Sequence, residues 1–268
     1  MASRRWRSLV AVQPGNGRLP FYCVHGAGGN VLNFRDLAHG MDRSQPFYGL
    51  QAWGVDGERS PLATIEAMAS AYLAEVTETQ PRGPYLLGGY SGGGVVAFEM
   101  ARRLSAAGER VSLLALIDTY FPKAPLLPLT LRSRLERLAK EGRSYVVTSL
   151  RRRMADRKRA KDLRLLDGYL ARGEKVPFAL RDAHLVRSFR RAAVLYEPAP
   201  WDGRATLFRA EEVPYAYRAA GSAYGWDRVI LGGVEAVPVP GSHHTLLLGK
   251  NAGPLVRSLS EAIARAQR

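Results

Sequence analysis

The clearest structural signal in the chain is the stretch PYLLGGYSGGGVVAFEM at residues 84–100. An apolar run over residues 84–87 leads into glycines on both sides of Ser91, and apolar side chains then recur at helical spacing over residues 95–104. Gly108 is the expected stop, because glycine adopts the left-handed conformation that ends many helices. The stretch therefore predicts a buried strand, a tight turn and a helix in direct succession.

The rest of the chain repeats this alternation on both sides of the turn. Strand-like apolar runs occupy residues 20–24, 46–55, 111–117, 205–209 and 234–239, and helical spacing begins at residue 33 and covers residues 64–78 and 252–266. Thr64 is the expected N-cap of the second of these helices. The run over residues 111–117 is apolar throughout, as is typical of a strand buried on both faces. We predict an α/β fold, with a mostly parallel central sheet flanked by helices.

Length and composition exclude several classes of protein. The chain has 268 residues, of which 46% are hydrophobic and 24% charged, which are ordinary globular values. Its single cysteine, Cys23, cannot form an internal disulfide or a structural zinc site alone, and we expect it to be a buried packing residue. No metal site is expected. No apolar run approaches the roughly 20 residues of a membrane-spanning helix, and the N-terminal apolar stretch is too short for a signal peptide. We expect a soluble, cytoplasmic protein with no membrane partner.

The positive charge is concentrated in one segment. The formal net charge is +15, and residues 123–191 hold 20 Lys and Arg residues against 7 Asp and Glu residues, a net charge of +13. Helical spacing recurs there at Leu131, Leu135 and Leu138, over residues 144–166 and over residues 181–195, and the segment shows no convincing strand pattern. We predict a core formed by residues 1–122 and 192–268, with residues 123–191 as a basic helical insertion.

Such a basic segment has three interpretations. It is a solvated helix face, a docking surface for an acidic partner, or a nucleic-acid-binding surface. The last is the remote alternative, because residues 150–164 lack interleaved aromatic side chains and any known binding motif. We therefore expect no nucleic-acid partner.

The turn Gly89-Tyr90-Ser91-Gly92-Gly93 matches the pattern G-x-S-x-G. A serine on a sharp turn between strand and helix is exposed above the sheet edge, and flanking glycines leave room for the strained backbone. The N–H groups and dipole of the following helix favour negative charge at this place. Ser91 is therefore the candidate nucleophile of a nucleophile elbow. The alternative is a glycine-rich phosphate or dinucleotide loop, which the pattern G-x-G-x-x-G half-matches.

A serine nucleophile needs a base, and the chain offers five histidines. In a strand–turn–helix protein of this kind the base follows the last strand. His243 and His244 come just after the apolar run over residues 234–239. We favour His243, which lies two residues after the turn glycine Gly241.

The acid that orients the base has two candidate positions. Asp118 ends the apolar run over residues 111–117, on the sheet edge that carries Ser91. Glu211 and Glu212 follow the next strand-like run. Only a carboxylate within hydrogen-bond reach of the imidazole Nδ1–H holds the required tautomer, and spacing alone leaves both positions open.

An oxyanion hole needs two preorganised N–H donors. One is expected from Gly92, directly after the nucleophile. The other is expected from the loop at residues 25–29, with Ala27 as the favoured donor. In this loop we expect His25 to shape the backbone rather than to act as a base.

These motifs together resemble the type I, chain-releasing thioesterase domain of modular polyketide synthases and nonribosomal peptide synthetases. The resemblance rests on PFYCVHGAGGNVLNFRDLA (20–38), YGLQAWGVDG (48–57), TIEAMA (64–69), PYLLGGYSGGGVVAFEMA (84–101), LLALIDTY (113–120) and VPGSHHTLL (239–247). It covers most of residues 9–122 and 195–260, and the motifs occur in the family's order and spacing. It implies an α/β-hydrolase fold with a helical lid insertion.

The resemblance also selects between the open alternatives. The family's acid lies in an L-x-L-x-D pattern, which residues 114–118 match as LALID, so the acid maps onto Asp118. Its G-D-H-x-x-L pattern maps onto residues 241–246 and selects His243, although Ser242 stands where the pattern commonly has Asp. The insertion at residues 123–191 matches the family's variable lid, whose sequence carries no useful similarity.

The activity that the resemblance implies is release of a polyketide or peptide acyl chain through a Ser91 acyl-enzyme, by hydrolysis or macrocyclisation. The substrate would arrive as a thioester on the phosphopantetheine of an acidic acyl or peptidyl carrier protein, with no cofactor bound by the enzyme itself. Possible contacts to the carrier or its phosphopantetheine are Arg151, Arg152, Arg153, Arg157, Lys158 and Arg159. The alternative is a stand-alone esterase or thioesterase, editing or lipase-like, that acts on small esters or thioesters. The acyl group and the oligomeric state, a homodimer included, stay open.

Overall fold

A seven-stranded sheet runs through the centre of the computed structural model, which describes residues 6–128, 130, 153–249 and 252–268. The strands are β1 (Leu9–Gln13), β2 (Phe21–Val24), β3 (Phe47–Leu50), β4 (Tyr85–Tyr90), β5 (Val111–Ile117), β6 (Ala205–Glu212) and β7 (Val234–Ser242). Their order across the sheet is β1-β3-β2-β4-β5-β6-β7, and every neighbouring pair is parallel except β1 and β3. The prediction of a mostly parallel α/β sheet is confirmed.

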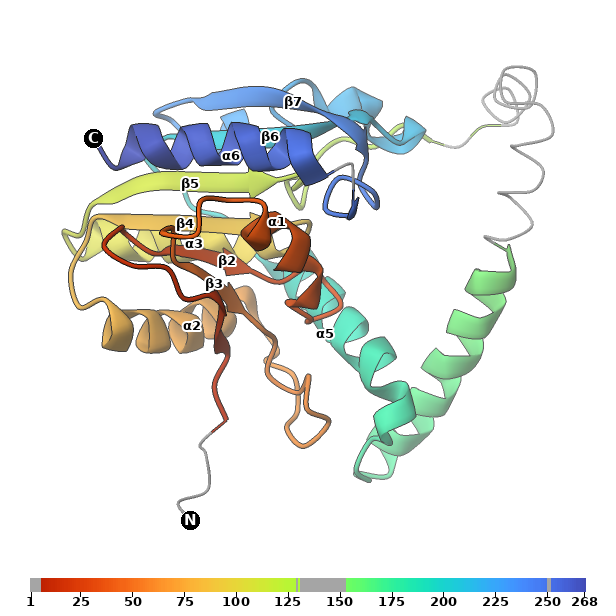
Figure 1. Ribbon diagram of the computed structural model, residues 1–268. Coiled ribbons are helices and arrows are strands. Elements are labelled where there is room, and N and C mark those ends of the chain that lie inside the picture. Colours follow the sequence, from red (N-terminus) through yellow and green to blue (C-terminus); the bar gives the residue numbers. More distant parts are fainter. Residues whose placement is uncertain (1–5, 129, 131–152, 250–251) are drawn as a thin grey trace, which may run out of the picture.

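Helices cover both faces of this sheet (Figure 1). They are α1 (Arg35–His39), α2 (Ile65–Thr79), α3 (Gly93–Ala106), α5 (Arg181–Leu195) and α6 (Ala252–Ala266). Short 3₁₀ turns add Leu32–Phe34, Phe178–Leu180, Tyr215–Ala220 and Trp226–Arg228. Side chains of α2, α3 and α5 bury one core, and those of α1 and α6 bury another on the opposite face. Both faces of the central strands are therefore dry, which explains their unbroken apolar sequences.

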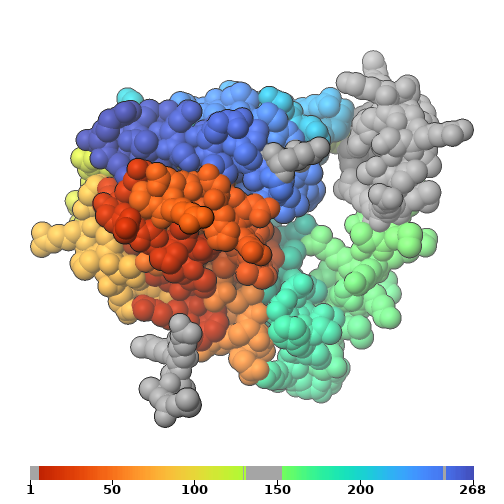
Figure 2. Space-filling model, viewed as in Figure 1, coloured from red at the N-terminus to blue at the C-terminus, as the bar shows by residue number. Residues whose placement is uncertain are grey.

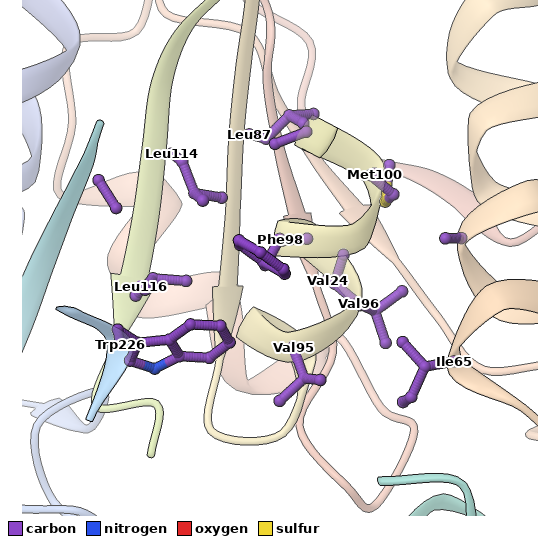
Figure 3. Close-up of a cluster of buried hydrophobic side chains, with 14 of the residues drawn as sticks. Val24, Ile65, Leu87, Val95, Val96, Phe98, Met100, Leu114, Leu116 and Trp226 are labelled. Carbon is purple, nitrogen blue, oxygen red and sulfur yellow. The ribbon is translucent and has the colours of Figure 1, made fainter. Parts of the chain in front are cut away.

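The core under α3 supports the turn at which the candidate nucleophile lies. Because alternate side chains of a strand point to opposite faces, β5 sends Leu114 and Leu116 into this core. Figure 3 shows them beside Phe98 of α3 and Trp226. The Phe98 and Trp226 ring centroids are 5.1 Å apart, and the indole N–H of Trp226 donates to the Thr119 carbonyl oxygen at 2.8 Å. This packing fixes the start of α3 and the segment after β5 relative to each other.

The helix ends follow the signals read from the sequence. Thr64 has an extended backbone, and its side-chain oxygen accepts a hydrogen bond from the Ala67 N–H at 3.1 Å, as expected of an N-cap. Helix α3 ends at Ala106, and Gly108 follows with a φ of +81°. Both predicted helix boundaries are confirmed.

Strand lengths are where the sequence prediction was wrong. The strand expected over residues 46–55 ends at Leu50, because the chain turns away at Ala52–Val55 and Gly54 adopts a φ of +87°. Strands β6 and β7 continue beyond the predicted runs, to Glu212 and Ser242. The edge strand β1 was not predicted, since its short run ends directly before Pro14, which has no N–H for a ladder.

The described strands all lie within residues 6–122 and 192–268. The division of the chain into a core and an insertion at residues 123–191 stays a prediction. The described part of residues 123–191 holds a helix over residues 153–171 and α5. In Figures 1 and 2 the first of these (green) stands at the rim of the molecule beside α5 (teal). Residues 144–152 of the predicted helix over residues 144–166 lie outside the described residues, and the described helix continues to residue 171. Leu131, Leu135 and Leu138 also lie outside the described residues.

Helix α5 packs onto the core with the face that the sequence predicted. Leu185, Phe189 and Ala192 are buried along one side of it. At its C-terminal end, the Tyr196 hydroxyl donates to the Glu99 carboxylate of α3 at 2.7 Å. Glu99 is itself buried and paired with Arg102 and Arg103. Helix α5 is therefore anchored to α3 by both apolar and polar contacts.

Candidate active site

Ser91 lies on a strained turn between β4 and α3. Its φ is +54°, a left-handed conformation that is uncommon outside glycine, and its backbone N–H donates to the Ile117 carbonyl oxygen at 2.8 Å. The bond to β5 holds the turn against the sheet edge. This strand–turn–helix geometry is that of a nucleophile elbow.

The glycines around Ser91 are required by close contacts. A Cβ on Gly89 would lie 2.3 Å from the Gly93 carbonyl carbon, and a Cβ on Gly93 would lie 2.2 Å from the His25 carbonyl oxygen. A Cβ on Gly92 would lie 2.3 Å from a ring carbon of Phe189. The turn is thus enclosed by α3, by the loop after β2 and by α5, so that larger residues do not fit at these positions.

His243 and Asp118 form a directly bonded pair. His243 Nδ1 lies 2.7 Å from Asp118 Oδ2, and the Asp118 side chain is fully buried. The second carboxylate oxygen, Oδ1, accepts from the Ala210 N–H at 2.9 Å and from the Tyr224 hydroxyl at 3.2 Å. Donors on both oxygens hold the carboxylate in the plane that the imidazole needs.

The structure brings one of the candidate acids into contact with one of the candidate histidines. Glu211 and Glu212 are exposed on the last residues of β6, whereas Asp118 contacts the imidazole. His244 is exposed, and its ring stands edge-on to that of His243 at 5.2 Å. Among these candidates in the described part of the chain, Asp118 and His243 are the carboxylate and imidazole in contact.

The loop after β2 is shaped by a buried histidine. His25 Nδ1 lies 2.5 Å from the Gly26 carbonyl oxygen, and Nε2 lies 2.8 Å from the Tyr72 hydroxyl. Burial lowers the pKa of His25 to about 4, so its ring is neutral near pH 7. A carbonyl only accepts, so Nδ1 donates and Nε2 accepts from Tyr72. His25 thus lies in the loop as a structural residue, as the sequence suggested.

One cavity of about 460 Å³ is lined by several of the candidate residues. Its lining includes Ser91, His243, His244 and Tyr90, and on the loop side Gly26, Ala27, Gly28, Gly29, Asn30, Leu32 and Asn33. A second, almost filled pocket of about 10 Å³ lies behind Ala27, under α5, where Trp53, Leu62, Met68, Leu185 and Phe189 surround it. Ala27 lines both the open cavity and the small apolar pocket.

Comparison with known proteins agrees with this geometry. The family model described as "Thioesterase domain" matches residues 20–263. The chain belongs to the thioesterase domain family. It has the α/β-hydrolase fold that the sequence predicted, and the chain-releasing thioesterase domains of polyketide and nonribosomal peptide synthetases are the group it resembles.

Individual relatives of this thioesterase domain are parts of larger proteins or isolated domains. Indigoidine synthase of Dickeya dadantii is 44% identical over 115 residues, which are 43% of this chain and 8% of that protein. The thioesterase domain of NocB, in a covalent complex with a fluorophosphonate nocardicin G analogue, has a TM-score of 0.66 and 26% identity over 96% of this chain and 98% of that one. A four-domain nonribosomal peptide synthetase, holo-AB3403, has a TM-score of 0.71 and 22% identity, covering 97% of this chain and 20% of that one. The chain spans less than a tenth of the length of its first curated relative.

Four of the six predicted basic contacts of this thioesterase domain fall on described residues. Arg151 and Arg152 are outside the described residues. Of the others, Arg153, Arg157 and Lys158 are exposed and Arg159 is half-buried on the helix over residues 153–171. The structure does not bring these four into the cavity lining. That helix is joined to α5 by an ion pair between Asp167 and Arg187. Within the described residues, no helix is long and apolar enough to cross a membrane, and the cytoplasmic location stays a prediction.

Two tyrosines of this thioesterase domain contact His243 and Asp118, and the sequence did not identify either contact. Tyr90 was predicted only as part of the elbow, yet its hydroxyl donates to the His243 carbonyl oxygen at 2.5 Å. Tyr224 donates to Asp118 from a loop more than 100 residues away in the chain. Its position in G-x-S-x-G marks Tyr90 as close to the site, but nothing in the sequence around Tyr224 distinguishes it from the other tyrosines.

Proposed function

We propose that the chain is a serine thioesterase that releases an acyl or peptidyl chain from the phosphopantetheine thioester of a carrier protein. The observation that carries the proposal is the bond between His243 Nδ1 and Asp118 Oδ2, in a cavity that Ser91 also lines. A neutral imidazole that donates from Nδ1 to a carboxylate leaves Nε2 free to accept a proton. Ser91, His243 and Asp118 are therefore assigned as nucleophile, base and orienting acid.

The first half of the reaction forms an acyl-enzyme. Ser91 Oγ attacks the thioester carbonyl carbon while His243 Nε2 takes the hydroxyl proton. The N–H groups of Gly92 and Ala27 are assigned to the oxyanion, with the N-terminus of α3 adding a favourable dipole. When the tetrahedral intermediate collapses, the C–S bond breaks and the proton on His243 passes to the departing pantetheine sulfur.

The second half returns the serine to its free form. Water, or a hydroxyl or amine of the acyl chain, attacks the ester and gives its proton to His243. The bond from the carbonyl carbon to Ser91 Oγ then breaks, and the serine recovers its proton from His243. Water yields an acid by hydrolysis, and an internal nucleophile yields a lactone or lactam by macrocyclisation.

Intact-mass spectrometry with a panel of acyl-pantetheine thioesters tests this assignment. We expect the wild-type protein to gain the mass of the acyl group, and Ser91→Ala to gain none and to lose turnover by several powers of ten. Near-full thioesterase activity in Ser91→Ala would refute the proposal. Products of the same reaction distinguish acid from lactone or lactam, and turnover only on small free esters would favour the stand-alone esterase.

We further assign the exposed side chains of Arg153, Arg157 and Lys158 to steering of an acidic carrier. Support comes from the +13 charge of residues 123–191 and from the exposure of these three side chains. Complementary charge raises association rates and is screened by salt.

A triple exchange to glutamine separates steering from catalysis. It should lower kcat/KM on a carrier-bound thioester about tenfold at low salt while sparing a small thioester. A matched control removes the same charge from three exposed core arginines, Arg204, Arg228 and Arg257. An equal loss in both triple variants, or no loss in the first, would exclude the lid as the steering surface.

A further inference from the structure

Tyr90, the residue before the candidate nucleophile, contacts the loops of both the base and the oxyanion donor. Its hydroxyl donates to the His243 carbonyl oxygen at 2.5 Å. Its ring lies face to face with the His243 imidazole, with centroids 5.1 Å apart and an interplanar angle of 21°. A Cβ on Gly26 would lie 3.1 Å from the same ring, so Tyr90 also packs against the loop after β2. The Tyr90 side chain therefore connects its own turn with the loop after β2 and with the loop that carries His243, which are far apart in the sequence.

The contacts of Tyr90 restrain the rotation of the His243 ring, which the hydrogen bond to Asp118 leaves free. A single hydrogen bond at Nδ1 fixes one atom of the imidazole but allows the ring to rotate about that bond. The flat ring of Tyr90 restricts this rotation, and its hydroxyl fixes the backbone of the residue that carries the imidazole. Burial, aided by the negative charge of Asp118, raises the pKa of Tyr90 to about 12, so the hydroxyl remains a donor near neutral pH.

We propose that Tyr90 is a positioning residue that sets the location and the plane of the His243 imidazole relative to Ser91. The proposal rests on the function assigned above to His243 and Ser91. Such a residue acts on the rate of proton transfer rather than on substrate binding, because a displacement of about 1 Å in a catalytic group costs about a hundredfold in rate. Its loss should therefore appear in kcat and not in KM.

Two variants and a matched control test the role. Tyr90→Phe removes the hydroxyl and keeps the ring, and Tyr90→Leu removes both. Tyr85→Phe is the control, because the Tyr85 hydroxyl also donates to a backbone carbonyl, that of Gln80 at 2.9 Å, outside the site. For each protein, kcat and KM on an acyl-pantetheine thioester, the rate of Ser91 phosphonylation by a small fluorophosphonate, and the thermal unfolding midpoint are measured.

We expect Tyr90→Phe to lower kcat and the phosphonylation rate about fivefold, and Tyr90→Leu about a hundredfold, with KM unchanged. Tyr85→Phe should leave both rates unchanged at a similar loss of thermal stability. The proposal is overturned if Tyr90→Leu labels as fast as the wild type, or if the rates of Tyr90→Phe and Tyr85→Phe fall alike. A wild-type protein that is not labelled at Ser91 would instead refute the assigned function, and this proposal with it.

Discussion

Asp118→Asn is the sharpest perturbation of the site, because it changes hydrogen-bond chemistry with almost no change in shape. The carboxylate accepts on both oxygens, from His243 at Oδ2 and from Ala210 and Tyr224 at Oδ1. Asparagine has one oxygen and one NH₂ group to place at these two positions. The Ala210 N–H belongs to the backbone of β6 and can only donate, so the asparagine oxygen must face it.

The NH₂ group of the variant then lies where Oδ2 was, 2.7 Å from His243 Nδ1. Two donors cannot face each other, so Nδ1 must lose its proton and Nε2 must carry it. A protonated Nε2 on a neutral imidazole cannot accept the proton of Ser91. In a serine protease the same exchange lowers kcat by about 10⁴, which corresponds to about 5 kcal/mol of transition-state stabilisation. We expect a loss of that order here.

The assay is single-turnover acylation of the protein by an acyl-pantetheine thioester near neutral pH, followed by intact mass. Glu211→Gln and Glu212→Gln are measured beside it, because both carboxylates are exposed at the end of β6. We expect these two to acylate within about twofold of the wild type, as is usual for surface substitutions. Acylation of Asp118→Asn within tenfold of the wild type, or a large loss in either glutamate variant, would refute the assignment of the acid.

Three further predictions concern the surroundings of the site. His25 has a pKa near 4 when folded against about 6.5 when unfolded, so the unfolded state binds more protons as the pH falls between these values. We therefore expect this group to make the free energy of unfolding, measured in urea, about 3 kcal/mol lower at pH 4 than at pH 7. In His25→Asn the free energy of unfolding should depend less steeply on pH. Phe189→Ala should cost about 3–5 kcal/mol of stability and raise the preference for bulkier acyl thioesters about tenfold, because it opens the pocket under α5 beside Gly92. Gly93→Ala should destabilise by about 3 kcal/mol and abolish labelling of Ser91 by a fluorophosphonate, since its Cβ would lie 2.2 Å from the His25 carbonyl oxygen.

Each of these three has an outcome that contradicts it. Equal pH dependence in His25→Asn would mean that other groups cause the acid sensitivity. An unchanged ratio of kcat/KM between short and bulky acyl groups in Phe189→Ala would remove α5 from substrate selection. For Gly93→Ala the matched control is Gly253→Ala, also near a helix start, where a Cβ would lie 3.8 Å from Arg257 Nη1. Equal labelling of the two glycine variants would contradict the steric argument.

The core of the site was predictable because of how a parallel sheet is built. Strand ends with the same direction meet at one edge, so Ser91 and Asp118, which follow neighbouring strands β4 and β5, had to lie near each other. Spacing in the sequence did not distinguish Asp118 from Glu211 as the orienting acid, because both follow a strand. That choice depended on the structure or on the family resemblance. Only the structure shows that one carboxylate is buried with three donors while the other is exposed.

The contacts of Tyr90 and Tyr224 could not be predicted from the spacing of residues in the sequence. A sequence pattern gives the face on which a side chain lies, but the position of a hydroxyl at the end of an aromatic ring depends on how distant loops pack. Tyr224 reaches Asp118 from a position at which its carbonyl oxygen accepts from the Phe121 N–H at 3.1 Å and its ring stacks on that of Tyr120, with centroids 4.0 Å apart. The length of β3 was missed for a similar reason: after Leu50 the Ala52 N–H donates to the Gly29 carbonyl oxygen in the loop after β2, and the chain then turns over residues 52–55.

Backbone strain provides an independent argument for where the site lies. Among the described residues, three that are not glycine have a positive φ: Ser91 at +54°, Asp118 at +45° and Tyr224 at +52°. Each such conformation costs about 1–2 kcal/mol, so chains rarely retain it unless the surrounding structure requires it. These three belong to one bonded set, because Tyr224 donates to Asp118, and the Asp118 and Ser91 backbones follow paired strands. Strain of about 3–6 kcal/mol at one sheet edge is a large part of the stability of a typical domain. Its concentration on the assigned nucleophile, the assigned acid and a donor to that acid is what is expected if the fold is held in a catalytic geometry rather than in its most relaxed one.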